Sequence, residues 1–186
     1  MLNKRIIIVF IVTGLILLIP LVAMQFTGEV NWSLFDFVFA AILLLSTGLV
    51  FEHAMRKANN LAYKAAAAIA IGTAFLLIWS NLAVGITGSE NNPVNLLYFG
   101  VLIIGIIGTV IARFQPRGMA QTLFVTAIAH TVAAVIALIL WNPVLDASFP
   151  EPDSSWLAVI GVNVMFVVLF TGSALLFLRA STAIKK

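Results

Sequence analysis

The sequence predicts an all-α, polytopic membrane protein: a bundle of six transmembrane helices. Of its 186 residues 62% are apolar and only 9% are charged, and the mean hydropathy is +1.14, whereas a soluble domain carries about a quarter charged residues. The apolar runs are long and continuous, unlike the alternating segments of about ten residues in an outer-membrane barrel. This composition excludes a soluble globular fold, a nucleic-acid-binding module and a disordered chain.

Each helix that crosses a membrane needs about 20 mostly apolar residues. The first qualifying segment follows Lys4 and Arg5, as in a secretory signal, but its apolar core exceeds the roughly 7 to 15 residues of a signal and is expected to stay as a span. Connections are short, about 6 to 15 residues, so we expect one transmembrane domain over 1–186 and no extramembrane domain. The predicted spans are 6–25, 33–52, 62–82, 95–113, 121–140 and 156–178.

Short patterns within the spans predict how the helices pack. Glu52 and Arg56, four residues apart at the end of the second span, predict an intrahelical ion pair. The third span contains AAAAIAIG, and the fourth contains Gly100, Gly105 and Gly108. Small residues let helix backbones approach closely in a membrane, so both stretches predict packing surfaces.

The basic residues predict that both termini are cytoplasmic. Lys and Arg resist translocation, and all ten occur at the chain ends or at the second and fourth connections, which share one side of a six-span protein. The opposite connections are acidic, and the longest of them, 141–155, looks like an outer cap. The net charge of +3 is therefore explained without an acidic ligand. The basic residues are Lys4, Arg5, Arg56, Lys57, Lys64, Arg113, Arg117, Arg179, Lys185 and Lys186.

A period of about 61 residues suggests three tandem helical hairpins, all in the same orientation. The alternative is that any hairpins of this length place Trp outside and Arg inside for membrane reasons alone. The matching positions are Trp32, Val94 and Trp156, and Arg56, Arg117 and Arg179.

Polar residues within the spans are the candidate functional residues, because ionisable groups are costly in hydrocarbon. Asp36, near the outer end of the second span, is either a cation or proton site, or a carboxylate that reaches the headgroup water or caps a neighbouring backbone. His130 lies at the midpoint of the fifth span. It either relays protons or binds a ligand, or it is a neutral imidazole that is hydrogen-bonded between helices. The candidate ligand- or ion-binding residues, which would line a cavity open to the periplasm, are Asp36, Asn81, Asn95, Tyr98, His130 and Asn163.

Several kinds of chemistry have no support in the sequence. The absence of cysteine excludes disulfides, iron–sulfur clusters and cysteine-ligated zinc. The two histidines, His53 and His130, differ in depth by about 15 Å, too far for a shared haem. No Walker loop, HExxH or nucleophile elbow occurs. We therefore expect no enzyme, no cofactor and no bound metal.

Three stretches are similar to a family of small hydrophobic bacterial proteins of no known activity. They are LIPLVAMQFTGEVNWSLFDFVFA, NLAVGITGSENNPVNLLYFGV and IARFQPRGMA. The resemblance covers about the first 140 residues and implies a bacterial inner-membrane location. It brings no catalytic residue and no cofactor.

Two functional hypotheses follow. In the first, the protein is a small channel or transporter-like module in which the polar residues contact a small ligand or cation that enters from the periplasm. In the second, it is a non-catalytic scaffold or accessory subunit of a larger membrane complex, and the polar residues only join helices. The expected partners are the lipid bilayer, a small ligand or cation, and a second copy or another membrane protein, with no nucleic acid.

Overall fold

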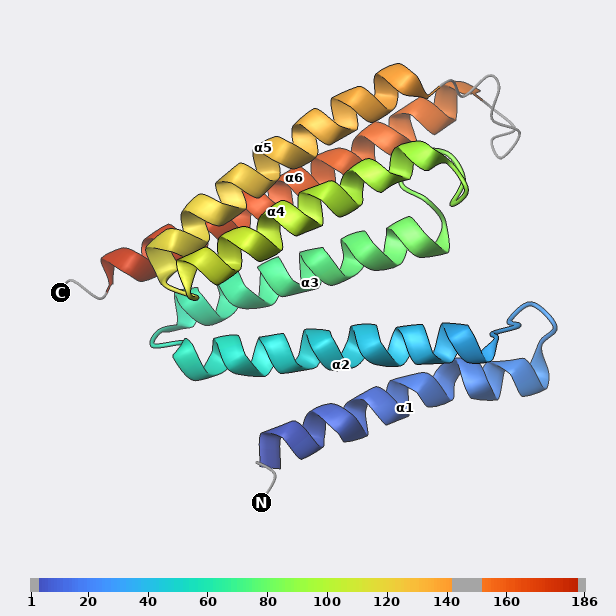
Figure 1. The fold of residues 1–186 in the computed structure, drawn as a ribbon, viewed down its shortest axis with the longest axis horizontal. Coiled ribbons are helices and arrows are strands. Elements are labelled where there is room, and N and C mark those ends of the chain that lie inside the picture. Colours follow the sequence, from blue (N-terminus) through green and yellow to red (C-terminus); the bar gives the residue numbers. More distant parts are fainter. Residues whose placement is uncertain (1–3, 142–151, 184–186) are drawn as a thin grey trace. The chain divides into compact units, whose positions relative to one another are not determined.

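The structure is a computed structural model that describes residues 4–141 and 152–183, so most of the predicted outer cap lies outside the described residues. Within this part of the chain it is entirely helical, and six helices are long and apolar enough to cross a membrane, as predicted (Figure 1). The elements are α1 (Lys4–Phe26), α2 (Leu34–Lys57), α3 (Leu61–Ala83), the short 3-10 helix η1 (Pro93–Asn95), α4 (Leu96–Ala112), α5 (Pro116–Leu140) and α6 (Pro152–Thr182).

Local signals account for the helix boundaries. α3 starts where the Asn60 side chain accepts a hydrogen bond from the Tyr63 backbone N–H, which satisfies an orphan donor of the first turn. α4 ends because Arg113 and Phe114 adopt left-handed φ angles of 49° and 60°. α5 begins at Pro116, five residues before the predicted start, since proline suits the first helical position.

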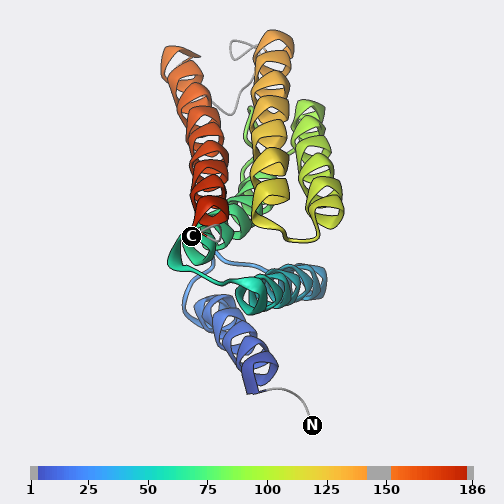
Figure 2. The ribbon, with the colours of Figure 1, turned by 90° about the vertical axis from the view of Figure 1, so that its left-hand side faces the viewer.

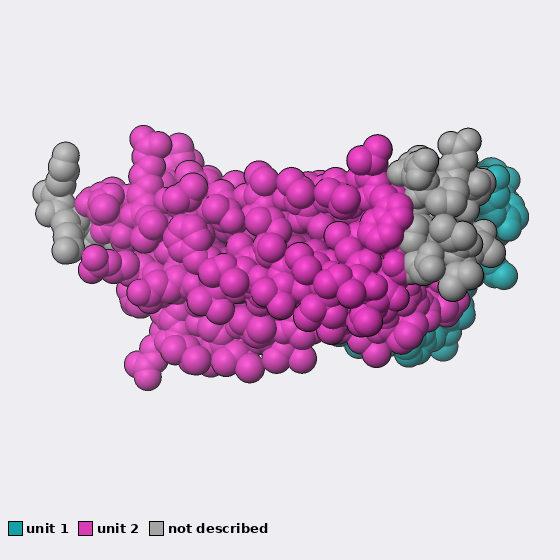
Figure 3. All heavy atoms as spheres, turned by 90° about the horizontal axis from the view of Figure 1, so that it is seen from above, with its two compact units in different colours: residues 1–57 teal, residues 58–186 magenta. Residues whose placement is uncertain are grey.

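The helices group into two compact units, Met1–Lys57 and Ala58–Lys186, which Figure 3 distinguishes by colour. The first contains α1 and α2, and the second contains α3 to α6. The single transmembrane domain over 1–186 stays a prediction.

The unit Met1–Lys57 is a helical hairpin with few buried residues. α1 and α2 lie side by side and run in opposite directions (Figure 1). They approach closely at Gly48, where an added Cβ would lie 2.6 Å from Val9 Cγ1. The predicted ion pair is present, with 2.9 Å between Arg56 Nε and Glu52 Oε1.

The unit Ala58–Lys186 is a four-helix bundle. α5 packs between α4 and α6, and α3 packs against α6 (Figure 2). Part of the predicted small-residue surfaces lies at these contacts: Ala66 and Ala67 of α3 are buried, and a Cβ added at Gly108 would lie 2.5 Å from Thr122 Cγ2. Gly100 is exposed, and a Cβ added there would meet no atom within 4 Å, so the prediction of a packing surface is wrong at that residue. Ser173 donates a hydrogen bond of 2.7 Å to the Ala66 carbonyl, so a polar contact joins α6 to α3.

Candidate functional site

Five of the six predicted site residues are buried in the four-helix unit. They come from the end of α3, from η1, from the start of α4, from the middle of α5 and from the first half of α6. None is more than 4% exposed, so they form an enclosed polar region rather than the walls of an open cavity. The five residues are Asn81, Asn95, Tyr98, His130 and Asn163.

Asn95 organises the connection between α3 and α4. Its Oδ1 accepts hydrogen bonds from the backbone N–H groups of Ile86 (3.2 Å) and Thr87 (2.9 Å), and its Nδ2 donates to the Ser89 carbonyl (2.8 Å). The chain turns tightly here at Gly85, whose φ of +76° suits glycine and whose added Cβ would lie 2.6 Å from the Ser89 backbone. The Asn95 side chain is therefore the centre around which this loop folds.

Asn81 joins this loop to α3. Its Nδ2 donates a hydrogen bond of 3.0 Å to the Asn95 carbonyl, whereas its Oδ1 has no partner among the described residues. Both asparagines thus have a structural role, which corresponds to the alternative that amides join the helices. Their ligand role stays a prediction.

Tyr98 links the loop to the interior of the bundle. Its hydroxyl lies 2.9 Å from Thr87 Oγ1, and its ring centroid lies 5.3 Å from that of His130. Two rings of α6 also contact the imidazole, Phe166 at 5.5 Å and Phe170 at 6.1 Å. His130 is 0% exposed, because three aromatic rings surround it.

The His130 imidazole and the Asn163 amide both have buried polar atoms without a hydrogen-bond partner among the described residues. Neither Nδ1 nor Nε2 of His130 has a hydrogen-bond partner within the described residues, and neither does Asn163 Oδ1. Asn163 Nδ2 donates to the carbonyl of Val159, one turn earlier (2.8 Å). The Asn163 side chain lies beside both His130 and Tyr98 without reaching hydrogen-bond geometry at the imidazole. A buried polar atom is normally paired, so three unpaired atoms on two neighbouring side chains of α5 and α6 are unusual.

Asp36, the sixth predicted residue, lies in the other unit and is exposed. Its Oδ2 accepts hydrogen bonds from the backbone N–H and the hydroxyl of Ser33, both at 2.7 Å. The Ser33 Oγ accepts in turn from the Asp36 N–H at 3.3 Å. This reciprocal pattern is a capping box at the start of α2, which gives the carboxylate the capping role considered from the sequence. Its role as a cation or proton site stays a prediction.

The groups that enclose the site are not among the residues predicted for it. Thr87 lies in the segment GITG, between Gly85 and Gly88, a pattern that indicates a tight turn. Phe166 and Phe170 follow Asn163 by three and seven residues, a helical spacing that places all three on one face. Both signals are present in the sequence, but neither specifies His130 as the neighbour.

The chemistry available at this site is that of one imidazole, one amide and one phenol. No group of three His, Cys, Asp or Glu that could hold a metal ion occurs in the part of the chain that the structure describes. No family model, curated protein or solved structure matches the chain. The functional argument therefore depends on the site itself.

Proposed function

We propose that the chain is a small channel or transporter-like protein of the bacterial inner membrane that binds a proton, cation or small polar ligand between His130 and Asn163. The observation that supports this proposal is the set of buried, unpaired atoms of these two side chains within helices that are long and apolar enough to cross a membrane. Leaving a buried polar group unpaired costs about 1 to 3 kcal/mol. An ionisable residue inside the membrane at this cost indicates a function.

Access to the site requires a conformational change, because His130 and Tyr98 are both 0% exposed. The loop folded around Asn95 contacts Tyr98 through Thr87. In the proposal, movement of this loop opens the polar region toward the periplasm.

The proposed topology has both termini in the cytoplasm and three hairpins of the same orientation that arose by duplication. The location of the termini is supported by the positions of the basic residues, which lie at the chain ends and at the second and fourth connections. An even number of candidate spans, six, likewise places both termini on the same side. The chain has no cysteine, so single cysteines introduced at Glu90 and Arg117 can be labelled cleanly in intact cells. We expect a membrane-impermeant thiol reagent to modify position 90 and not position 117. Labelling of both from the same side would contradict the topology.

Flux measurements test the transport proposal. The protein is reconstituted into vesicles that contain a pH-sensitive dye, and proton and potassium movements are followed after a gradient is imposed. If His130 carries the proton or contacts the cation, His130→Gln is expected to slow the flux by about a hundredfold, and Asn163→Leu should lower it as well. His53→Gln, which changes the other histidine, is the matched control and should behave as wild type.

Flux equal to that of empty vesicles, or flux that His130→Gln leaves unchanged, would contradict the transport proposal. The scaffold or accessory-subunit function would then be favoured. It has its own structural support: the hydrogen bonds of Asn81 and Asn95 hold the fold together. In addition, an open apolar groove of about 380 Å³ lies between α4 and α5, lined in part by Ile104, Ile107 and Ile111.

The groove provides the test of this second candidate. A photoreactive amino acid at Ile107 in the groove should crosslink to one discrete membrane protein or to a second copy of the chain. The same probe at Ile139, an exposed residue of α5 outside the groove, is the control and should label lipid. Equal labelling patterns at the two positions would contradict a scaffold function for this face.

A further inference from the structure

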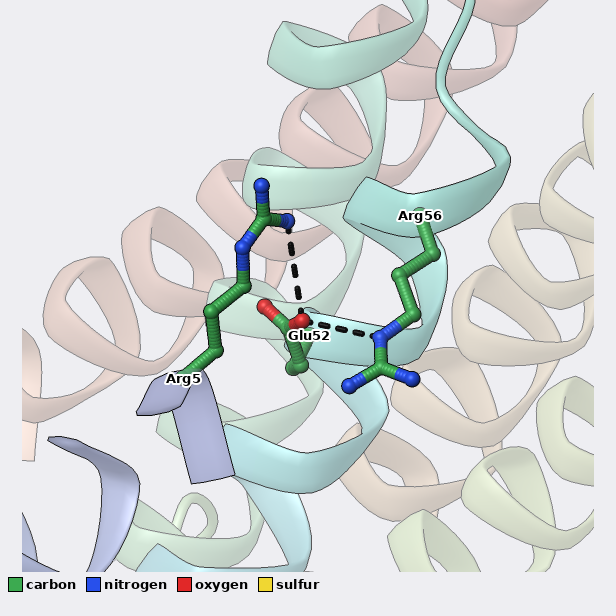
Figure 4. Close-up of polar contacts among 3 residues, drawn as sticks. All are labelled: Arg5, Glu52 and Arg56. Carbon is green, nitrogen blue, oxygen red and sulfur yellow. Dashed lines mark hydrogen bonds and ion pairs between the residues drawn. The ribbon is translucent and has the colours of Figure 1, made fainter. Parts of the chain in front are cut away.

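The Glu52 carboxylate contacts two arginines, Arg5 and Arg56. The three residues lie where α1 begins and α2 ends. Glu52 Oε1 lies 2.9 Å from Arg56 Nε and 3.6 Å from Arg5 Nη1 (Figure 4). The Glu52 side chain is only 13% exposed, whereas those of Arg5 and Arg56 are 62% and 46% exposed. The carboxylate thus lies beneath two guanidinium groups that face outward.

Basic residues outnumber acidic ones in and beside this cluster. Two guanidinium groups share one carboxylate, and Lys4 and Lys57 are adjacent in sequence to Arg5 and Arg56. The contact of Arg56 with Glu52 uses Nε, so this contact leaves both terminal nitrogens of Arg56 available to an acceptor. Retention of basic residues on one side of the membrane explains their presence here, but it does not explain why one partly buried carboxylate contacts two of them.

The three side chains and Met55 line an open pocket of about 470 Å³. A guanidinium group presents a planar fork of donors that matches the oxygens of a phosphate. The pocket lies within about two turns of the ends of two helices that are long and apolar enough to cross a membrane. We therefore expect it near the lipid headgroups. Met55 adds an apolar wall beside the charged groups.

We propose that the pocket formed by Arg5, Glu52, Met55 and Arg56 binds a phosphate-bearing anion, with the guanidinium groups of Arg5 and Arg56 as donors and Glu52 as the residue that positions them. The headgroup of an anionic lipid and free inorganic phosphate both have this chemistry. The site is independent of the His130 region, so the proposal stands or falls separately from the transport function.

The test uses the full chain, purified in a neutral detergent. It is titrated with short-chain phosphatidylglycerol, with phosphatidylcholine of the same chain length, and with inorganic phosphate as a competitor, and bound lipid is counted by native mass spectrometry. One basic residue near the surface contributes about a fivefold change in affinity for anionic lipid, so Arg56→Gln and Arg5→Gln are each expected to weaken phosphatidylglycerol binding by about that factor. Arg117→Gln is the matched control, because Arg117 is an exposed arginine in the other unit.

The outcomes distinguish a lipid headgroup from free phosphate, and a specific site from non-specific binding to positive charge. Preference for phosphatidylglycerol without competition from phosphate supports a lipid headgroup, and competition by phosphate supports a site that also accepts the free anion. Equal losses of phosphatidylglycerol affinity in Arg56→Gln and Arg117→Gln would show that binding depends on the overall positive charge of the protein and not on this pocket. That result would overturn the proposal. Unchanged binding in both Arg5→Gln and Arg56→Gln would overturn it as well.

Discussion

Both units of the chain consist of helices apolar enough to cross a membrane, but the share of each helix that is buried differs greatly between them. α1, in the hairpin unit, contains the most apolar stretch, with a mean hydropathy of 3.2, yet only 6% of that stretch is buried. α3, in the four-helix unit, contains the least apolar of the six, with a mean hydropathy of 1.9, and 33% of it is buried. Hydropathy therefore indicates that a helix crosses the membrane, whereas burial within the protein follows a different property.

That property is the presence of small and polar side chains. Lipid tails are as apolar as leucine, so helix association in a membrane depends on close packing and interhelical hydrogen bonds rather than on hydrophobic burial. Among the described residues, Thr13 is the only buried polar residue of the hairpin unit. Those of the four-helix unit are Thr73, Asn81, Thr87, Asn95, Thr122, Thr126, His130, Asn163 and Ser173.

The largest expected contrast between the units is the effect of removing a phenylalanine ring. Phe177 of α6 is 0% exposed and makes an edge-to-face contact with Tyr63 at 5.0 Å, so Phe177→Ala should lower the free energy of unfolding by about 3 kcal/mol. Phe10 of α1 is 51% exposed, and Phe10→Ala should change the free energy of unfolding little. Unfolding by SDS in mixed micelles measures both. Equal effects would mean that the exposed faces of α1 are buried in a larger assembly.

The next effect concerns the buried loop of the four-helix unit. Asn95→Ala removes one donor and one double acceptor and leaves the N–H groups of Ile86 and Thr87 unpaired, so we expect a loss of about 2 to 3 kcal/mol. Asn91→Ala changes an exposed asparagine of the same loop and is the control. Thermal unfolding in detergent provides the measurement. A stable Asn95→Ala protein that has lost ligand binding would instead favour the ligand role of this residue.

A smaller effect is expected at the contact of α4 with α5. Gly108→Ala places a methyl group 2.5 Å from Thr122 Cγ2 and should destabilise the bundle by about 1 to 3 kcal/mol. Gly100→Ala, in the same helix, meets no atom within 4 Å and should be neutral or slightly stabilising because alanine favours the helix. The same unfolding assay compares the pair, and equal stabilities would refute close packing at Gly108.

The smallest predicted effect lies in the hairpin unit. Ser33→Ala removes the capping box with Asp36 and should cost about 1 kcal/mol, confined to the first turn of α2. Hydrogen exchange should therefore quicken at the first amides of α2 and stay unchanged in α3 to α6. Ser181→Ala, at an exposed serine near the end of α6, is the control. Faster exchange throughout the chain would show that the two units are strongly coupled.

The sequence by itself determined the helical class and the six membrane-crossing helices, because length and hydropathy are properties of each segment alone. It also indicated the ion pair of Glu52 with Arg56, since residues four apart on a helix are always neighbours. It located the boundaries less well, as at Pro116, where the helix includes polar residues that hydropathy excludes.

Only the tertiary structure decided which polar residues meet. Asp36 and His130 were equivalent candidates in the sequence, but Asp36 caps its own helix while His130 is enclosed by rings from α4 and α6. The cluster of Arg5 and Arg56 on Glu52 likewise requires α1 to lie beside α2. Contacts of this kind depend on which helix faces which, and hydropathy does not encode the rotation of a helix about its axis.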